Sequence, residues 1–142
     1  MKKLNCILLV DDDSSDNFLN RRAIEKAGIT DHIEISLNGR EALEFLTAKN
    51  DRWNSRHSYP QPELIFLDIN MPVMNGWEFL KEHQKLEDFQ KGKVVLMMLS
   101  ASINPADRIT AELKLGSDCF QSKPLTVGVI NKIMMKYFPD HL

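Results

Sequence analysis

Acidic residues stand directly after two of the apolar runs in this chain, and a lysine ends a third run. Asp11 and Asp12 follow the first run, Asp68 closes another, and Lys123 comes late in the sequence. Continuous apolar runs are typical of parallel strands buried on both faces, and open α/β sheets bind ligands at the carboxyl ends of their strands. Three carboxylates and one ammonium are therefore expected to meet at one edge of a sheet.

A group of carboxylates in one crevice is electrostatically unfavourable unless a cation is bound among them. Mg²⁺ suits such a site because it binds carboxylates, water and phosphate oxygens. We expect Asp12 and Asp68 to be direct ligands, with the backbone carbonyl of Asn70 as a third. Asp11 is expected to act through water or by holding Lys123.

The same residues are suited to phosphoryl transfer, which needs an in-line nucleophile, a metal ion and compensating positive charge. Asp68 can be the nucleophile, since carboxylates form aspartyl phosphates in covalent catalysis. Lys123 would bind one phosphoryl oxygen. The Ser100 hydroxyl and the Ala101 N–H, which end a fourth apolar run, would bind another.

The lysine is followed directly by Pro124. The cis form of an X–Pro bond costs little and makes a tight turn, which would direct the Lys123 ammonium back toward the carboxylates. We favour the cis form over the alternative, an ordinary trans connection from a strand to a helix.

Strand-like and helix-like segments alternate five times, which predicts an α/β fold: a doubly wound parallel sheet with right-handed crossovers and helices on both faces. The second strand alternates with period two, as an edge strand does, and this favours the flavodoxin-like strand order 2-1-3-4-5. Ser14 and Ser15 are expected to cap the first helix. The predicted strands cover 6–10, 33–37, 64–68, 94–99 and 118–122, and the predicted helices begin near residues 14, 39, 76, 105 and 126.

Length and composition indicate one globular domain. The chain has 142 residues, of which 43% are hydrophobic and 27% charged, with a formal net charge of −2. A charge of this size gives no reason to expect nucleic acid as a partner. No apolar stretch approaches the roughly 20 residues of a membrane span, and no secretory signal is recognisable, so we expect a cytoplasmic protein without a membrane segment.

Five segments in order along the chain match one family pattern. They are Val10–Asp13, Leu67–Pro72, Asn75–Gly76, Leu99–Ala101 and Lys123–Pro124. Over about residues 5–138 the chain resembles the receiver domains of bacterial response regulators. The resemblance implies a stand-alone, chemotaxis-regulator-like receiver of a two-component phosphorelay.

The resemblance also implies roles for individual residues. Asp68 would accept a phosphoryl group, with Mg²⁺, from a sensor histidine kinase or a phosphotransfer protein. Ser100 and Phe120 would form the switch, in which the hydroxyl moves to the phosphoryl group and the aromatic ring turns inward. The protein would catalyse only its own phosphoryl transfer and dephosphorylation, so it would not be an enzyme in the usual sense.

Residues 1–142 are expected to be a single receiver domain without an output domain, so its signal would pass through protein contacts. The contact surface would lie within about 104–137 and would bind a downstream protein or a second copy in a homodimer. The long polar segment 49–63 is similar to that of receivers that partner phytochrome-type and related hybrid sensor kinases. Its Trp53 and Tyr59 would pack on the domain or contact a partner.

Two alternative functions are compatible with the sequence. Asp11, Asp13 and Ser15 resemble the start of haloacid-dehalogenase-type phosphatases, in which the first aspartate is the nucleophile. The other alternative is a degenerate receiver that acts as an adaptor independently of phosphate. Asp13, Asp16 and Asp31 are interpreted as solvated or helix-capping residues rather than as ligands.

Overall fold

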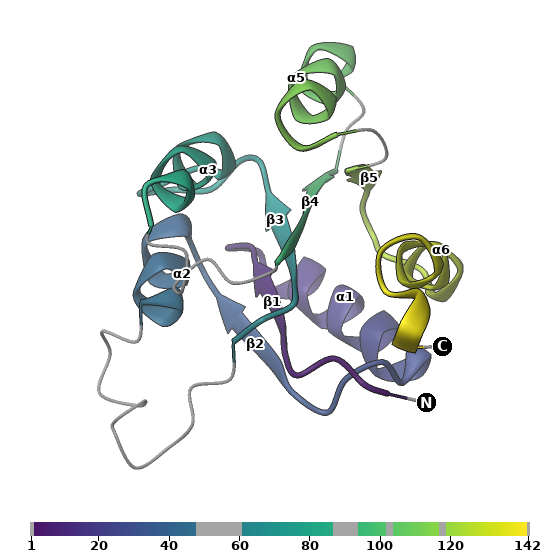
Figure 1. Cartoon of the computed structure of the whole chain (residues 1–142). Helices are drawn as coiled ribbons and strands as arrows, with labels where there is room; N and C mark the ends of the chain where they lie inside the picture. The colour runs from purple at the N-terminus through teal and green to yellow at the C-terminus, as the bar shows by residue number, and fades with distance from the viewer. Residues whose placement is uncertain (1, 48–60, 87–93, 102–103, 117–118, 142) are drawn as a thin grey trace.

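The computed structural model describes residues 2–47, 61–86, 94–101, 104–116 and 119–141. Five parallel strands form one sheet in the order β2-β1-β3-β4-β5, which confirms the predicted order (Figure 1). The expected fold class, a flavodoxin-like doubly wound sheet, is therefore confirmed. The strands are β1 (Ile7–Val10), β2 (Ile33–Ser36), β3 (Leu64–Asp68), β4 (Val95–Ser100) and β5 (Phe120–Ser122).

Each helix begins after a polar side chain that accepts a hydrogen bond from a backbone N–H of the first turn. The cap of α1 is Asp13, which accepts from the N–H of Asp16, so the expectation that Ser14 or Ser15 caps this helix is wrong. Asn38, Asn75, Asn104 and Thr126 cap the other helices of the described residues. The helices are α1 (Ser14–Ala27), α2 (Gly39–Leu46), α3 (Gly76–Gln84), α5 (Pro105–Leu115) and α6 (Val127–Tyr137), followed by a 3₁₀ turn, η1 (Pro139–His141).

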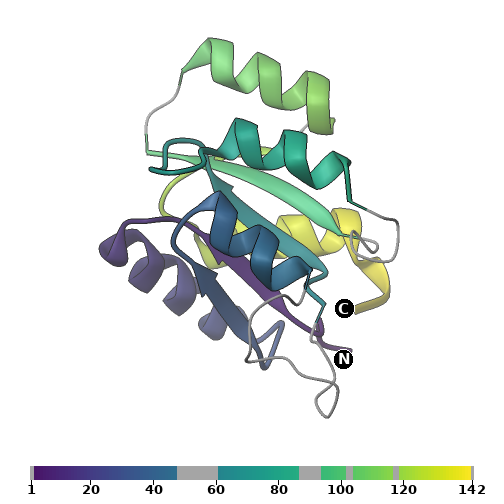
Figure 2. The same cartoon turned by 90° about the vertical axis from the view of Figure 1, so that its left-hand side faces the viewer.

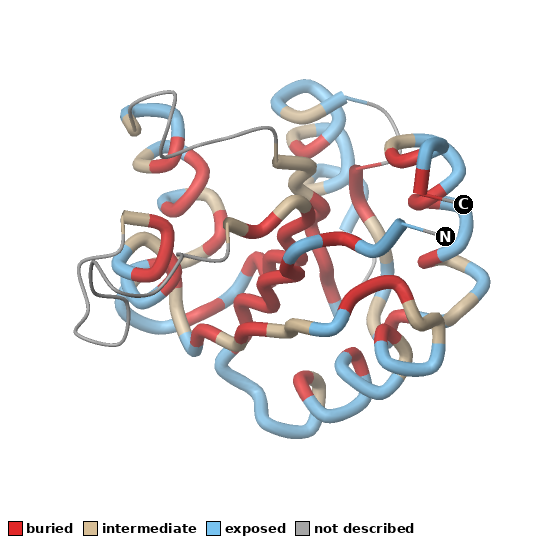
Figure 3. Tube along the Cα trace, turned by 60° about the horizontal axis from the view of Figure 1, so that its bottom comes forward, coloured by how far each residue is buried: buried red, intermediate tan, exposed pale blue. Residues whose placement is uncertain are grey.

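The helices cover both faces of the sheet, as predicted. Helices α1 and α6 lie on one face, and α2, α3 and α5 lie on the other (Figures 1 and 2). Successive strand residues point to opposite faces. Ile7 and Leu9 accordingly pack in the cluster beneath α1 and α6, whereas Leu8 and Val10 pack in the cluster beneath the other three helices. The central strands are buried on both faces, while exposed residues follow the outer sides of the helices (Figure 3).

No helix in these described ranges has both the length and the hydrophobicity needed to cross a bilayer. Cys6 and Cys119 are buried, and neither is part of a disulfide. Residues 48–60 lie outside the described part of the chain, so the predicted packing of Trp53 and Tyr59 stays a prediction.

Gly76 begins α3 where this helix lies against the end of β3. Its N–H donates to the carbonyl oxygen of Ile69 at 2.9 Å. A Cβ at this position would lie 2.6 Å from the backbone oxygen of Asp68 and 3.0 Å from the Cα of Ile69. The absence of a side chain therefore allows the start of α3 to pack directly on the backbone that carries Asp68.

Replacing Gly76 with alanine is expected to lower the free energy of unfolding by about 1–3 kcal/mol, because the methyl group overpacks a backbone that cannot move aside. Gly128→Ala is the matched control, since a Cβ there would meet only the hydroxyl oxygen of Thr126, at 3.9 Å. Alanine is favoured over glycine within a helix by roughly 0.5–1 kcal/mol, so this variant should be slightly more stable than the parent. Urea unfolding of the three proteins measures both effects. A Gly76→Ala variant as stable as the parent would contradict the packing argument.

Candidate functional site

The carboxyl ends of β1 and β3 are neighbours, because these strands pair in parallel with Val10 opposite Leu67. Asp11 and Asp68 come next along the two strands, and both are buried. Together with the exposed Asp12 they place carboxylate oxygens within 4.8 Å of one another. The structure thus assembles the predicted acidic cluster, with one of its members open to solvent.

The side chain of Lys123 joins this cluster from the end of β5. Its backbone N–H donates to the carbonyl oxygen of Ser100 at 2.8 Å, and its peptide bond to Pro124 is cis, as predicted. The ammonium nitrogen lies 2.7 Å from Asp11 Oδ2 and 3.2 Å from Asp68 Oδ1, and the side chain is 6% exposed. Asp11 therefore holds the lysine directly, which is one of the two roles expected for it.

Sequence reasoning missed Asp16 as a member of this group. Its Oδ2 lies 2.9 Å from the ammonium nitrogen of Lys123. The interpretation as a capping or surface residue holds for Asp13, which caps α1, and for Asp31, which pairs with Lys3. It is wrong for Asp16, because the first turn of α1 directs this side chain toward a lysine that is 107 positions away in the sequence.

Two buried asparagines on one face of α1 bond to the backbone on either side of the site. Asn17 Nδ2 donates to the carbonyl oxygen of Asp11 at 2.9 Å, and Asn20 Oδ1 accepts from the N–H of Leu125 at 2.9 Å. Residues three apart on a helix share a face. Helix α1 therefore joins the end of β1 to the turn that follows Lys123, and no local sequence pattern indicated this role.

The site contains more carboxylates than positively charged groups. Burial, together with the charge of Asp11, raises the pKa of Asp68 to about 6 against the opposing effect of Lys123. Burial also raises the pKa of Asp11, although its bonds to Lys123 and to the N–H of Asp13 oppose the shift. For Lys123, burial favours a lower pKa, but hydrogen bonds to Asp11 and Asp16 outweigh it and the pKa is raised. The lysine stays charged, and one ammonium faces several acids.

Three further residues that the sequence singled out lie beside the cluster. The N–H of Asn70 donates to the carboxylate of Asp68. Ser100 ends β4, which pairs with β3 so that Leu99 lies opposite Asp68; Ser100 is buried and Ala101 is exposed. The neighbouring strand therefore brings Ser100 and Ala101 to the same edge of the sheet, while their predicted roles toward a phosphoryl group stay predictions.

Phe120 begins β5, and its ring packs in the cluster beneath α2, α3 and α5 with an exposed fraction of 3%. The guanidinium carbon of Arg108, on α5, lies 5.3 Å from the centre of the ring. The inward turn implied by the resemblance is therefore not needed to bury this ring, which is already inside. A movement of Ser100 and Phe120 on phosphorylation stays a prediction.

The loop between β3 and α3 contains a residue in an unusual backbone conformation. Val73 has a φ of 68°, and the N–H of Met74 donates across it to the carbonyl oxygen of Pro72 at 2.7 Å. This is a γ-turn of the rare, strained kind with positive φ. A β-branched residue with positive φ is an outlier, and such strain is found at functional sites. Here it lies five residues beyond Asp68.

Replacing Val73 with asparagine is expected to raise the free energy of unfolding by about 1 kcal/mol, because asparagine adopts a positive φ more readily than a β-branched residue does. The side chain is 72% exposed, so little packing is lost. Thermal and urea unfolding of the two proteins measure the difference. A less stable Val73→Asn variant would show that the valine side chain contributes more than its backbone strain costs.

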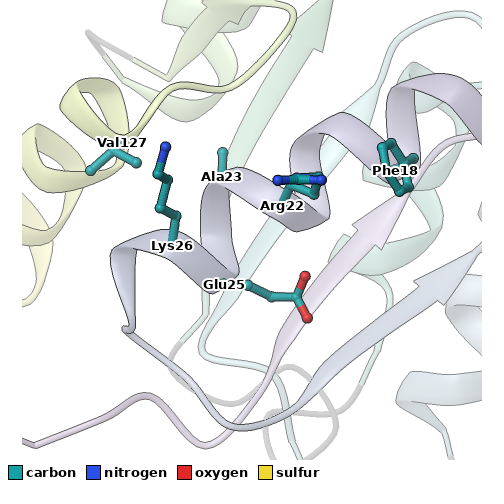
Figure 4. Close-up of a pocket in the computed structure, with 6 residues that line it drawn as sticks. All are labelled: Phe18, Arg22, Ala23, Glu25, Lys26 and Val127. Atoms are coloured by element: carbon teal, nitrogen blue, oxygen red, sulfur yellow. The ribbon is translucent and has the colours of Figure 1, made fainter.

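A hollow beside α1 is separate from the acidic cluster. It is lined by Phe18, Arg22, Ala23, Glu25 and Lys26 of this helix and by Val127 of α6 (Figure 4). The guanidinium carbon of Arg22 lies 5.7 Å from the ring centre of Phe18. None of the clustered carboxylates lines this hollow, so it is not part of their site.

The site geometry disfavours the phosphatase alternative. In that class Asp11 would be the nucleophile and Asp68 would have no such role, but here the Asp11 carboxylate accepts from the N–H of Asp13 and holds Lys123, and the same lysine lies 3.2 Å from Asp68. A doubly wound sheet with an acidic cluster at its switch point and a lysine after its fifth strand instead defines the class of receiver domains in signal transduction.

Comparison with known proteins agrees with this class. The family model described as "Response regulator receiver domain" matches residues 7–134. The response regulator Rcp1 of Synechocystis is 31% identical over 117 residues, which are 82% of this chain and 75% of Rcp1. The chain belongs to the response regulator receiver domain family of two-component signalling.

Solved structures support the same assignment. A two-component response regulator from Cytophaga hutchinsonii is 33% identical, with a TM-score of 0.75 over 95% of this chain and 97% of that one. The bacteriophytochrome response regulator AtBRR is 26% identical, with a TM-score of 0.76 over 94% and 91%. The Mn²⁺-bound form of Rcp1 is 28% identical, with a TM-score of 0.65 over 94% and 93%. Three other curated relatives are longer, and the chain spans 42%, 28% and 59% of their lengths.

Proposed function

We propose that the protein accepts a phosphoryl group on Asp68 from a histidine kinase or phosphotransfer protein and signals through a change in its own surface. The observation that carries this proposal is the position of Asp68. Its carboxylate is buried at the end of the central strand, 3.2 Å from the Lys123 ammonium and grouped with two further acids. The adaptor alternative has less support, because the groups needed for phosphoryl transfer lie together.

In the proposed reaction an Asp68 carboxylate oxygen attacks the phosphorus of a phosphohistidine in line with the leaving nitrogen. A P–O bond forms as the P–N bond breaks, and the imidazole nitrogen keeps the electron pair of the broken bond. Lys123 stabilises negative charge on the phosphoryl oxygens, and the Ser100 hydroxyl and the Ala101 N–H bind another of these oxygens. The N–H of Asn70 keeps the attacking carboxylate in place through its hydrogen bond.

The three clustered carboxylates fit a hard divalent cation, since Mg²⁺ binds oxygen ligands and keeps several waters. We propose Asp12 and Asp68 as direct ligands and the backbone carbonyl of Asn70 as a third. When bound, Mg²⁺ would neutralise charge on the phosphoryl oxygens. The Mn²⁺-bound form of Rcp1 supports a divalent ion in a related protein.

The phosphoacceptor assignment predicts a labelling result. In the presence of Mg²⁺ and acetyl phosphate, the parent should gain one acid-labile phosphate and Asp68→Asn should gain none, because an amide is not a nucleophile for phosphorus. Asp13→Asn is the matched control: it makes the same change of charge nearby and keeps a side chain that can cap α1. Intact-mass spectrometry measures the product. Labelling of Asp68→Asn to the level of the control would refute the assignment.

The metal proposal predicts that Asp12→Ala binds Mg²⁺ at least about tenfold more weakly, an effect as large as that of losing groups that support a metal site. Trp77, at the start of α3, serves as the fluorescent reporter. The chain has two tryptophans, so the titrations are made in a Trp53→Phe background to isolate this signal. Asp13→Asn should bind Mg²⁺ like the parent. Equal affinity in Asp12→Ala would rule out Asp12 as a ligand.

We propose that the output surface consists of α5, β5 and α6, which lie within the predicted range 104–137. Exposed apolar side chains lie on both of its helices, which suits contact with a protein partner or a second copy of the chain. Leu113 is 82% exposed, and Ile109 and Met135 are also exposed. The Lys123 N–H bond to Ser100 connects this surface to the phosphoryl site.

This proposal predicts that a phosphoryl mimic changes hydrogen exchange within 104–137 and that the change depends on the Ser100 hydroxyl. Ser100→Ala keeps Asp68, Lys123 and the acidic cluster, so it should still bind beryllofluoride with Mg²⁺. At saturation, its exchange response in this range should be smaller than that of the parent, because one contact with the bound group is missing. A full response in Ser100→Ala would contradict the proposed switch.

A further inference from the structure

Three carboxylates share one ammonium in this site. The nitrogen of Lys123 lies 2.7 Å from Asp11, 2.9 Å from Asp16 and 3.2 Å from Asp68. A lysine ammonium has three N–H donors and no acceptor. These carboxylates can therefore engage all of its donors before any phosphoryl group arrives.

The three partners differ in how easily they can release the lysine. The side chains of Asp11 and Asp68 are 5% and 9% exposed, whereas that of Asp16 is 30% exposed. Separating a buried carboxylate from its cation carries a large desolvation penalty, and a carboxylate near the surface can be hydrated instead. Asp11 is also held by the N–H of Asp13 and, through its backbone, by Asn17. Asp16 is thus the partner that can be exchanged.

The net charge of the site also favours release of Lys123 by Asp16 when a phosphoryl group binds. Asp11, Asp12, Asp16 and Asp68 carry four negative charges against the single positive charge of Lys123. A bound divalent cation would still leave the group with a net negative charge. A phosphoryl group carries about −1.5 to −2 and replaces the single negative charge of the Asp68 carboxylate, so the site becomes more negative by roughly 0.5–1. Its strong acceptor oxygens need the ammonium that Asp16 engages.

We propose that Asp16 is a competing positioning residue: its carboxylate holds Lys123 in the resting protein and must give up this contact when Asp68 is phosphorylated. The inference rests on the proposed function of Asp68. Asp16 thereby lowers the affinity of the site for a phosphoryl group.

Release of the contact leaves α1 intact. Asp16 lies in the first turn of this helix, where a negative charge is favoured by the helix dipole even without a partner. Its backbone N–H is held separately by the carboxylate of Asp13 at 3.0 Å. The side chain can therefore turn to solvent while the helix start keeps its cap.

The test is a titration with beryllofluoride at saturating Mg²⁺, using the full chain and its Asp16→Asn variant. The variant should bind beryllofluoride about fivefold more tightly than the parent, a change that corresponds to roughly 1 kcal/mol, the upper value for a partly exposed ion pair. Its affinity for Mg²⁺, measured separately, should not increase. A residue with a merely structural role would weaken binding when replaced, so the direction of the change identifies competition.

Asp13→Asn is the control for charge alone, because it removes one negative charge from the same helix start without a contact to the lysine. Its beryllofluoride affinity should stay close to that of the parent. Equal or weaker binding by Asp16→Asn would overturn the inference, and so would an equal gain in Asp13→Asn. A parent that does not bind beryllofluoride at all would instead overturn the proposed function of Asp68, and the inference with it.

Discussion

The ion pairing of one buried lysine with several acids is the interaction on which this site depends. Without Lys123, the burial of Asp11 and Asp68 would place like charges together in a medium that screens them poorly. With it, the acids remain close enough to bind a cation, and the lysine remains charged. The remaining shortage of positive charge makes the site receptive to a divalent ion.

The parallel sheet brings these groups together through its strand order and register. The order of the strands places β1 beside β3, and the register sets Asp11 next to Asp68. Each of the other contributors arrives from a different direction: Ser100 from β4, Lys123 from the end of β5 and Asp16 from α1. At the same edge, Gly76 lets α3 approach the backbone of β3, which limits how far the loop after Asp68 can move.

The sequence predicted the parts of this structure that depend on local signals. Capping residues such as Asn38 and Asn75 marked helix starts, and the acids at strand ends, combined with the strand order, located the site. The contact of Asp16 was not predicted, because its partner Lys123 is distant in the sequence. An acid in the first turn of a helix is favoured by the helix dipole whether its side chain faces the site or the solvent, so the sequence does not distinguish the two cases. The positive φ of Val73 also has no local signal, since valine disfavours it and only the tertiary structure imposes it. The buried ring of Phe120 depends on packing under α5 that the sequence does not show.

Through Asn17 and Asn20, helix α1 sets the distance between two loops of the site. One bonds to the backbone of Asp11 and the other to the backbone of Leu125, so the offset between these two loops follows the rise of an α-helix, about 1.5 Å per residue. Spacing across the site is therefore tied to a regular helix rather than to the twist of the sheet. A single residue inserted between the two asparagines would turn the second by about 100° away from its partner. A change of length between these two residues would therefore break one of the two backbone contacts.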